Sequence, residues 1–464
     1  MTTRSRVDTA GRLLLWWIPV ALLSVFLGRL VGKDMRLAIQ LVGAVAIGVL
    51  ILTRKVLVLV PLTLVMLAWG SSTLSGISTA YTAKFAMIGA VAALAAPALL
   101  VPARSRLPVP AAFGIGFFGL LLFALLSSAW SVDPAFTVQR TLSMLLVCGA
   151  VVFGIPLSLR GPDDLRELLY RNGLVLGGVT LAGFVLGAAG AVTAFQGGGR
   201  FQGLLVNANT LGYFAAPILP PLIVLAARLP AGRRRRTAVA AIAATGVGIA
   251  LSGSRGGAAS VIIGTAFALL LSSTTRQRGQ SRRIGLIAAG ALIAAVVVVP
   301  LLGQSARTGS GSTEGYFTLG TGSERTVKWS ESVSAMFDRP LGGHGFGTTP
   351  LIFPSIQSRT DVITLGGAHD GYIDTALELG FPGAICLVLL AMSGLVAALR
   401  TARASGPEQL VATMLMAGIV AGMIEALIES GILAAGGLFA FPFWMAVALA
   451  HSLRRGQVRR LARA

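Results

Sequence analysis

The chain has 464 residues, of which 55% are hydrophobic and only 12% are charged, and its mean hydropathy is +0.81. A soluble protein of this length could not bury so much apolar surface, so a soluble globular class is excluded and lipid is the expected solvent. The net charge of +21 would suggest nucleic acid for a soluble chain. Here the arginines gather at the ends of apolar runs, where the positive-inside bias explains them, so we expect a lipid bilayer and no nucleic acid as partner.

Apolar runs of roughly 17 to 23 residues recur along the chain and predict an all-α polytopic integral membrane protein with about 12–14 transmembrane helices. The candidate spans lie near residues 13–28, 37–53, 56–70, 85–101, 109–129, 141–158, 173–193, 211–227, 237–252, 257–273, 285–303, 381–399, 409–428 and 432–451. Three parts follow from them. Residues 1–303 form the first part of the helical bundle, residues 304–380 form one large polar loop, and residues 381–464 hold the C-terminal helices and a basic tail.

Charge in the connections predicts the orientation of the chain. Lys and Arg concentrate in the even-numbered connections and in the tail, whereas the odd-numbered connections are poor in them. The exception is the first connection, which carries Arg29, Lys33 and Arg36. The bias predicts a multi-pass membrane protein with both termini cytoplasmic and the polar loop on the outer face.

Two further amphipathic helices are predicted. Residues 161–173 carry leucines at helical spacing between charges and are expected to lie along the cytoplasmic interface. In the polar loop, Trp329, Val333, Met336 and Phe337 recur at helical spacing and predict a helix over residues 324–338. Pro340 and the glycines after it end that helix, and a glycine-rich turn alone is more often a plain turn than a phosphate-binding loop.

Three arginines on the predicted outer side are not explained by the positive-inside bias. Arg255 lies in the short turn "SGSRGG", Arg325 lies at the start of the loop helix, and Arg200 precedes "FQGLLVNAN". Guanidinium groups match phosphate oxygens, so these residues suggest an anion held near the outer headgroups. The alternative is snorkelling to lipid headgroups, which explains Arg200 equally well.

His369 stands in "AHDGYIDTALELGFPG", directly before a predicted helix. Asp370 is expected to cap this helix, and the positive helix end should then favour a neutral imidazole that can accept a proton from a hydroxyl. Asp370, Asp374 and Glu378 are spaced four apart and share one helix face. A loop histidine without special role remains the alternative.

Together these segments resemble the bacterial O-antigen ligase and O-antigen polymerase superfamily, from about residue 110 onward. The segments that carry the resemblance are "SSAWSVDP" (127–134), "GLLVNANTLG" (203–212), "LSGSRGG" (251–257), "GSERTVKW" (322–329), "RPLGGHGFG" (339–347) and the His369 segment. The last follows the family's pattern of His, a small residue, nine residues and Gly-x-x-Gly, with Gly380 and Gly383 as the glycines. Asp370 departs from the commoner Asn at its position.

The resemblance implies a GT-C-like glycosyltransferase of the bacterial inner membrane that takes an undecaprenyl-diphosphate-linked saccharide as donor and a glycan or lipid as acceptor. It implies that catalytic elements lie in the polar loop, with Arg255 and Arg325 on the diphosphate and His369 assisting the attacking hydroxyl. Substrate-binding roles are expected for Arg200, Asn209, Asp370, Gly380 and Gly383. We expect no cofactor and no metal, because the sequence shows no ligand cluster, and inversion at the sugar if attack is direct.

Other functions remain open. A transporter or flippase for a lipid-linked saccharide predicts charges near the bilayer midplane, and Glu425 and Glu429 are explained as well by packing between helices. A scaffold of the polysaccharide-assembly machinery, an expected partner, would make the outer Arg and His residues dispensable. Among glycosyltransferases we favour a polymerase or exopolysaccharide role over ligation to lipid A core, since nothing in the sequence marks an outer-membrane lipid acceptor.

Overall fold

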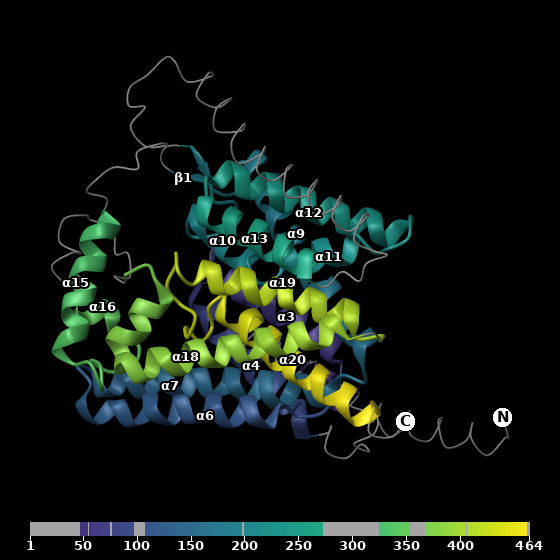
Figure 1. Cartoon of the computed structure of the whole chain (residues 1–464). Helices are drawn as coiled ribbons and strands as arrows, with labels where there is room; N and C mark the ends of the chain where they lie inside the picture. The colour runs from purple at the N-terminus through teal and green to yellow at the C-terminus, as the bar shows by residue number, and fades with distance from the viewer. Residues whose placement is uncertain are drawn as a thin grey trace, which may run out of the picture. The chain divides into compact units, whose positions relative to one another are not determined.

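The computed structural model describes residues 47–53, 55–74, 77–96, 107–196, 199–271, 324–352, 368–404 and 406–461 (Figure 1). The chain divides into two units, Met1–Thr53 and Arg54–Ala464. In the first unit only the end of one helix is described, and the helices below all belong to the second unit. The predicted spans near 13–28 and 285–303, most of the span near 37–53, and residues 304–323 and 353–367 of the predicted loop lie outside the described residues.

The described part of the second unit is helical except for one short hairpin. Its α-helices are α3 (Val56–Trp69), α4 (Ile77–Ala93), α6 (Ala111–Leu126), α7 (Pro134–Gly149), α8 (Ile155–Ser158), α9 (Pro162–Ala188), α10 (Ala208–Ala215), α11 (Leu219–Ala226), α12 (Arg233–Ser252), α13 (Arg255–Leu271), α15 (Glu324–Asp338), α16 (Thr349–Ile352), α18 (Gly371–Arg403), α19 (Gln409–Glu425) and α20 (Ala440–Leu461). A 3-10 turn, η2 (Ser127–Trp130), follows α6, and a π turn, η3 (Ala150–Gly154), joins α7 to α8. The hairpin pairs β1 (Phe195–Gln196) antiparallel to β2 (Arg200–Phe201). The predicted all-α class is confirmed.

Several helices are long and apolar enough to cross a membrane. Among the described residues four helical segments meet this criterion: Ala111–Trp130, Pro134–Ser158, Pro162–Ala188 and Gly371–Arg403. The pair α10 and α11, bent by 53°, adds a fifth if it forms one broken span. Four further apolar helices are only 10–17 residues long, whereas a straight crossing takes about 20 residues. The polytopic class is therefore confirmed, and the number of 12–14 spans stays a prediction.

The core lies where α18, α19 and α20 meet α6. α18 packs along both α19 and α20, and α19 also packs along α13 (Figure 1). The indole of Trp444 is fully buried in α20, with its ring centroid 4.8 Å from that of Phe117 in α6. Because α20 is buried on all sides from residue 440 to residue 450, it is a central helix of the bundle.

The predicted division between the helix over residues 161–173 and the span near 173–193 is wrong, whereas the position of residues 161–173 at the cytoplasmic interface stays a prediction. These residues are the first turns of α9, which runs without a break for 27 residues. Pro162 occupies the first turn, where a missing N–H is tolerated. Gly173 does not end the helix, because its bare backbone admits the side chain of Leu222 in α11: a Cβ there would lie 2.8 Å from a Leu222 methyl group.

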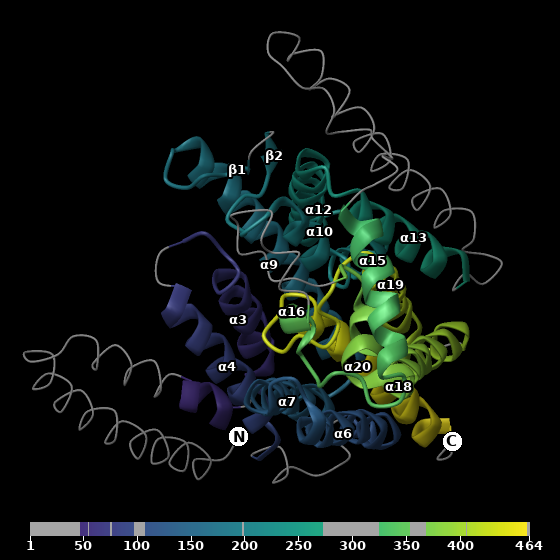
Figure 2. The same cartoon turned by 90° about the vertical axis from the view of Figure 1, so that its left-hand side faces the viewer.

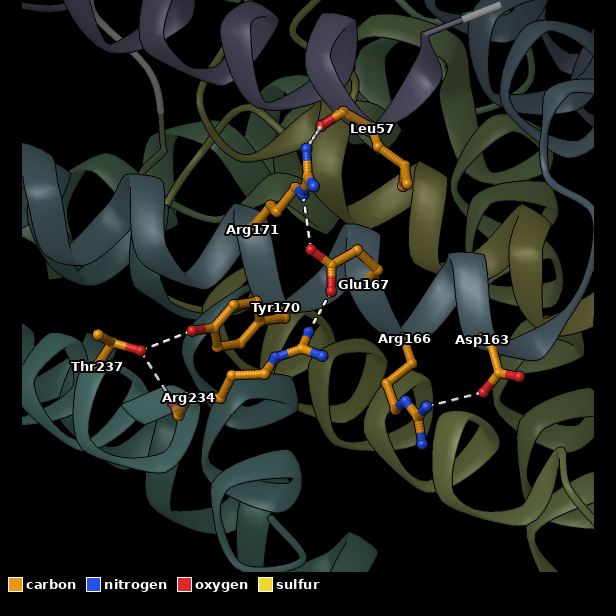
Figure 3. Close-up of polar contacts among 8 residues, drawn as sticks. All are labelled: Leu57, Asp163, Arg166, Glu167, Tyr170, Arg171, Arg234 and Thr237. Carbon is orange, nitrogen blue, oxygen red and sulfur yellow. Dashed lines mark hydrogen bonds and ion pairs between the residues drawn. The ribbon is translucent and has the colours of Figure 1, made fainter. Parts of the chain in front are cut away.

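A cluster of charges at the start of α9 ties this helix to α3 and α12 (Figure 3). The Glu167 carboxylate accepts a hydrogen bond from Arg171 Nε at 2.8 Å and pairs with Arg234 through its other oxygen. Arg171 Nη1 also donates to the carbonyl of Leu57 in α3 at 2.9 Å. The guanidinium of Arg234 lies 4.8 Å from the ring centroid of Tyr170. These contacts are structural and involve none of the residues predicted for the site.

Candidate active site

His369 precedes α18 in a backbone conformation that few L-residues adopt. Its φ of 54° is the one positive φ of a non-glycine residue in the part of the chain that the structure describes. The N–H of Ala368 donates to the Asp374 carboxylate at 2.9 Å, and the N–H of Gly371 donates to the carbonyl of Ala426 at 2.7 Å. Such strain amounts to about 1–3 kcal/mol and persists where the surroundings hold it, often at functional sites.

Asp370 caps α18, as the sequence predicts. One oxygen of its carboxylate accepts the N–H groups of Tyr372 and Ile373 at 2.9 and 3.0 Å. Burial raises the pKa of Asp370 above its usual range, and the two backbone hydrogen bonds oppose this shift. The cap fixes the direction in which α18 leaves His369.

The long helix α18 is broken at Gly380. This residue has φ 68° and ψ −179°, a region that is essentially restricted to glycine. A Cβ at Gly380 would lie 2.6 Å from the carbonyl oxygen of Pro340. The N–H of Phe381 donates to that carbonyl at 2.8 Å instead of continuing the helical ladder.

The break leaves two helical carbonyls to be paired, and the turn after α15 provides their donors. The carbonyl of Leu377 accepts the N–H of His344 at 2.9 Å, and the carbonyl of Glu378 accepts the N–H of Gly345 at 3.0 Å. In a regular helix the carbonyl of Glu378 would face Pro382, which has no N–H. The turn after α15 thus supplies the hydrogen-bond donors that the break in α18 leaves missing.

The segment 127–134 is bound to the same turn. Trp130 Nε1 donates to the carbonyl of Gly342 at 2.9 Å, and Arg339 Nη1 donates to the carbonyl of Trp130 at 3.0 Å. The N–H of Val132 donates to the carbonyl of His344 at 3.0 Å. Three of the segments that carry the family resemblance therefore meet around the N-terminal part of α18.

The helix predicted over residues 324–338 is confirmed as α15, which packs along α18 (Figures 1 and 2). Met336 contacts Ala376 and Leu377 of α18 in a buried apolar cluster. Trp329 Nε1 donates to the carbonyl of Ala368 at 2.8 Å. α15 thus supports the residue immediately before His369.

The other two segments of the resemblance, 203–212 and 251–257, meet through glycines. A Cβ at Gly257 in α13 would lie 2.3 Å from the Cα of Gly212 in α10, so this close approach requires small residues. The side chain of Asn207 caps α10 by accepting the N–H of Thr210 at 2.9 Å. Arg200 in β2 joins the two segments, because its Nε donates to the carbonyl of Ser252 at 2.8 Å.

A chain of polar contacts connects Arg200 to His369. Arg200 Nη2 donates to Asn209 Oδ1 at 2.6 Å, and Asn209 Nδ2 donates to Glu429 Oε1 at 3.2 Å. The other carboxylate oxygen of Glu429, Oε2, lies 3.3 Å from His369 Nδ1. Three predicted site residues are thus brought together, and Glu429 links them.

Asn209, Glu429 and His369 line a cavity of about 330 Å³, whereas Arg200, a predicted substrate-binding residue, is not among its lining residues. The cation Arg140 of α7 lines the cavity as well. The remaining lining residues are Asn207, Thr210, Tyr213, Phe346, Gly347, Thr349, Pro350, Gly371, Asp374, Thr375, Glu378, Ser430, Gly431, Ile432, Leu433 and Ala434. A concave, partly polar site of this size is typical of a small-molecule or saccharide site.

Arg255 is not among the described residues that line this cavity. Arg255 is exposed at the first residue of α13, and in the described part of the chain its guanidinium has no hydrogen-bond or ion-pair partner. The next residue, Gly256, packs on Ile428: a Cβ there would lie 2.7 Å from the Ile428 side chain, beside Glu429. Arg325 lies in the first turn of α15, and its side chain is outside what the structure describes.

Asp370, Gly380 and Gly383 do not line the cavity either. Asp370 acts as a helix cap and Gly380 allows the break in α18. A Cβ at Gly383 would lie 2.3 Å from the Cβ of Leu379. Their predicted substrate contacts stay predictions, and the geometry gives all three a structural role.

Glu429 and Arg140 line the cavity, and neither was assigned to the site from the sequence. Glu429 follows α19 and was explained there by packing between helices. Arg140 ends the polar segment 130–140, and its guanidinium lies 4.7 Å from the ring centroid of Phe136. The argument applied to Arg200, Arg255 and Arg325 in the sequence could have found Arg140.

The ligating side chains of the described residues do not gather into a metal centre. No three His, Cys, Asp or Glu residues among them are placed to hold one ion. A metal-independent reaction stays a prediction.

The fold and the site define a polytopic, all-α membrane protein with a polar cavity built where several helix ends meet. Residues 239–388 match the model of the O-antigen ligase family. This match supports the O-antigen ligase and polymerase superfamily and, in general terms, a membrane glycosyltransferase or ligase acting on lipid-linked glycans. A comparison with curated proteins found no match. The matched region holds Arg255, Arg325, His369, Gly380 and Gly383, whereas Arg200 and Asn209 precede it and Glu429 follows it.

Proposed function

We propose that the protein transfers a saccharide from an undecaprenyl-diphosphate-linked donor to a hydroxyl of a glycan or lipid acceptor on the outer face of the membrane. The observation that carries this proposal is the placement of His369. Its imidazole lines a polar cavity, its Nδ1 lies 3.3 Å from a carboxylate, and it belongs to the region that matches the O-antigen ligase family.

His369 acts as the general base in this reaction. When Nδ1 carries a proton toward Glu429, Nε2 is free of a proton and accepts the one on the attacking acceptor hydroxyl. The acceptor oxygen forms a bond to the anomeric carbon of the donor sugar, and the bond from that carbon to the phosphate oxygen breaks. The lipid diphosphate leaves with the bonding electron pair, and a single direct displacement inverts the anomeric carbon.

Arg255 and Arg325 stabilise the charge that develops on the leaving diphosphate. The guanidinium of Arg255 is exposed and has no ion-pair or hydrogen-bond partner among the described residues, so it can make such a contact, and its neighbour Gly256 packs beside Glu429. Two permanent cations can serve here without a metal ion, since preorganised positive charge is what the leaving group needs. Removal of one such group typically lowers a rate by about 10²–10³.

The test is a comparison of bond formation with lipid movement. The purified full chain is placed in vesicles that hold an undecaprenyl-diphosphate-linked saccharide, and the products are separated by glycan length and by leaflet. A new glycosidic bond with release of undecaprenyl diphosphate supports the proposal. Movement of intact donor between leaflets without a new bond overturns it in favour of a flippase.

The same experiment distinguishes acceptors. We favour a polymerase or exopolysaccharide role, for which the lipid-linked saccharide alone is enough substrate. A ladder of longer lipid-linked glycans supports this role, whereas product formed only after lipid A core is added identifies a ligase.

A further inference from the structure

The carboxylate of Glu429 contacts both Asn209 and His369 in the wall of the cavity. Its two oxygens have different partners, with Oε1 accepting from Asn209 Nδ2 at 3.2 Å and Oε2 lying 3.3 Å from His369 Nδ1. Its side chain is only 15% exposed, compared with 34% for His369. Because the effective dielectric constant is lower around a largely buried carboxylate, Glu429 interacts with the imidazole more strongly than a solvent-exposed carboxylate would.

The orientation of the Asn209 amide follows from its partner on the other side. Arg200 has only donors, so the atom of Asn209 that faces its Nη2 at 2.6 Å must be the oxygen. The amide nitrogen of Asn209 therefore faces Glu429 and donates to it. Arg200 is itself held by the carbonyl of Ser252, which accepts from its Nε at 2.8 Å.

The backbone around Glu429 fixes its distance from His369. The N–H of Glu429 donates to the carbonyl of Glu425 at 2.9 Å, one turn back along the chain. The carbonyl of Ala426, between them, accepts the N–H of Gly371 at 2.7 Å, two residues after His369. The end of α19 and the start of α18 are thus joined directly beside the carboxylate and the imidazole.

We propose that Glu429 is the positioning residue for His369. Its carboxylate accepts the Nδ1–H, which leaves Nε2 as the proton acceptor, and it stabilises the imidazolium that forms when Nε2 takes the proton of the acceptor hydroxyl. Asn209 and Arg200 hold the carboxylate in place, which gives these two residues a supporting role in place of the predicted substrate contact. The inference rests on the proposed function, because it needs His369 to act as the base.

The experiment measures transfer by Glu429→Gln in the full chain, in vesicles with lipid-linked saccharide. The amide keeps the shape of the side chain and loses its charge, so kcat should fall by about 10–100-fold, as for other residues that orient a functional imidazole. The KM for the donor should change less than about twofold, because Glu429 acts on the base and not on the bound donor. Glu425→Gln is the matched control. The Glu425 carboxylate accepts a hydrogen bond from Ser260 Oγ at 2.7 Å and does not line the cavity, so the transfer rate of this variant should be unchanged.

A double-variant cycle separates positioning from general damage. In the His369→Ala background, Glu429→Gln should cause no further fall in the residual rate, since its only route of action is gone. A further 10-fold fall in that background would overturn the inference, and so would a kcat for Glu429→Gln that equals the wild-type value. Either result leaves the proposed function intact, which fails instead if the wild-type chain forms no glycosidic bond.

If Glu429→Gln does not fold, the variant Asn209→Ala tests the same inference. This variant leaves the Glu429 carboxylate in place and removes its donor, so kcat should fall less than in Glu429→Gln, again with little change in KM. This fall should also vanish in the His369→Ala background. A rise in the KM for the donor with unchanged kcat would assign Asn209 to substrate binding and overturn its supporting role.

Discussion

The N–H of Phe381 donates to the carbonyl of Pro340 at 2.8 Å, across a break in α18, instead of continuing the helical ladder. The glycine-rich turn at 339–347 is therefore part of the helix architecture. The N–H groups of Gly343, His344 and Gly345 all donate within the protein. A turn whose donors are used in this way is not an anion-binding nest, so the diphosphate of the proposed donor would be held by other groups.

Gly380 should tolerate no side chain. We expect Gly380→Ala to lower the free energy of unfolding by about 2 kcal/mol or more, because a backbone with φ 68° and ψ −179° is unfavourable for an L-residue by about 1–3 kcal/mol. The added Cβ would also lie 2.6 Å from the carbonyl oxygen of Pro340. Thermal unfolding in detergent measures the change. Gly178→Ala in α9 is the control, since a Cβ there meets nothing within 4 Å, and an equal loss of stability in both variants would contradict the role of Gly380.

The cap at Asp370 predicts a difference between two substitutions. Asp370→Ala removes the acceptor of two N–H groups and should lower stability by about 1 kcal/mol. It should also lower the transfer rate, because the cap sets the start of α18 beside His369. Asp370→Asn should keep both properties near wild type, since Asn caps helices equally well. Melting temperature and transfer rate are measured together, and equal damage from the two substitutions would argue that the charge of Asp370, and not its capping, matters.

Arg255 should affect activity without affecting stability. Its guanidinium has no partner in the described residues, so Arg255→Ala should leave the melting temperature unchanged. Transfer should fall by about 10²-fold, the typical loss for one group that stabilises developing charge. Arg255→Lys should restore part of the rate, because it keeps the charge but loses the bidentate geometry. Arg233→Ala, exposed at the start of α12, is the control; wild-type transfer by Arg255→Ala would remove this residue from the site.

The Glu167 cluster predicts the opposite pattern. Glu167→Gln loses the ion pairs to Arg171 and Arg234, which are partly exposed, so stability should fall by no more than about 1 kcal/mol. Transfer per folded molecule should be unchanged, since the cluster lies at the start of α9 and contacts no residue of the cavity. Chemical unfolding followed by a transfer assay at matched folded concentration checks both statements. A transfer rate that falls while stability is retained would reveal coupling to the site.

The sequence predicts those features that are local. The cap at Asp370 follows from one residue and the helix after it, and α15 follows from the spacing of Trp329, Val333, Met336 and Phe337. Gly173 shows the limit of such signals. The segment 161–173 and the span near 173–193 were predicted as two elements that meet at this residue, but in the structure it is an interior residue of α9 that makes room for Leu222.

The features missed from the sequence depend on contacts between distant segments. Glu429 lies 60 residues after His369 and 220 residues after Asn209, and no periodicity connects the three. The pairing of Gly345 with the carbonyl of Glu378 likewise depends on how a turn and a broken helix meet. In a sequence, an acidic residue next to a helix end looks the same whether its side chain packs between helices or positions a residue of the site.

The most direct measurement is the transfer rate of His369→Ala in vesicles that contain undecaprenyl-diphosphate-linked saccharide, with the melting temperature measured on the same preparation. A fall of about 10²–10⁴-fold, the usual contribution of a general base, with an unchanged melting temperature is the predicted result. A wild-type rate of glycosidic bond formation in this variant would contradict the role of His369 as the base.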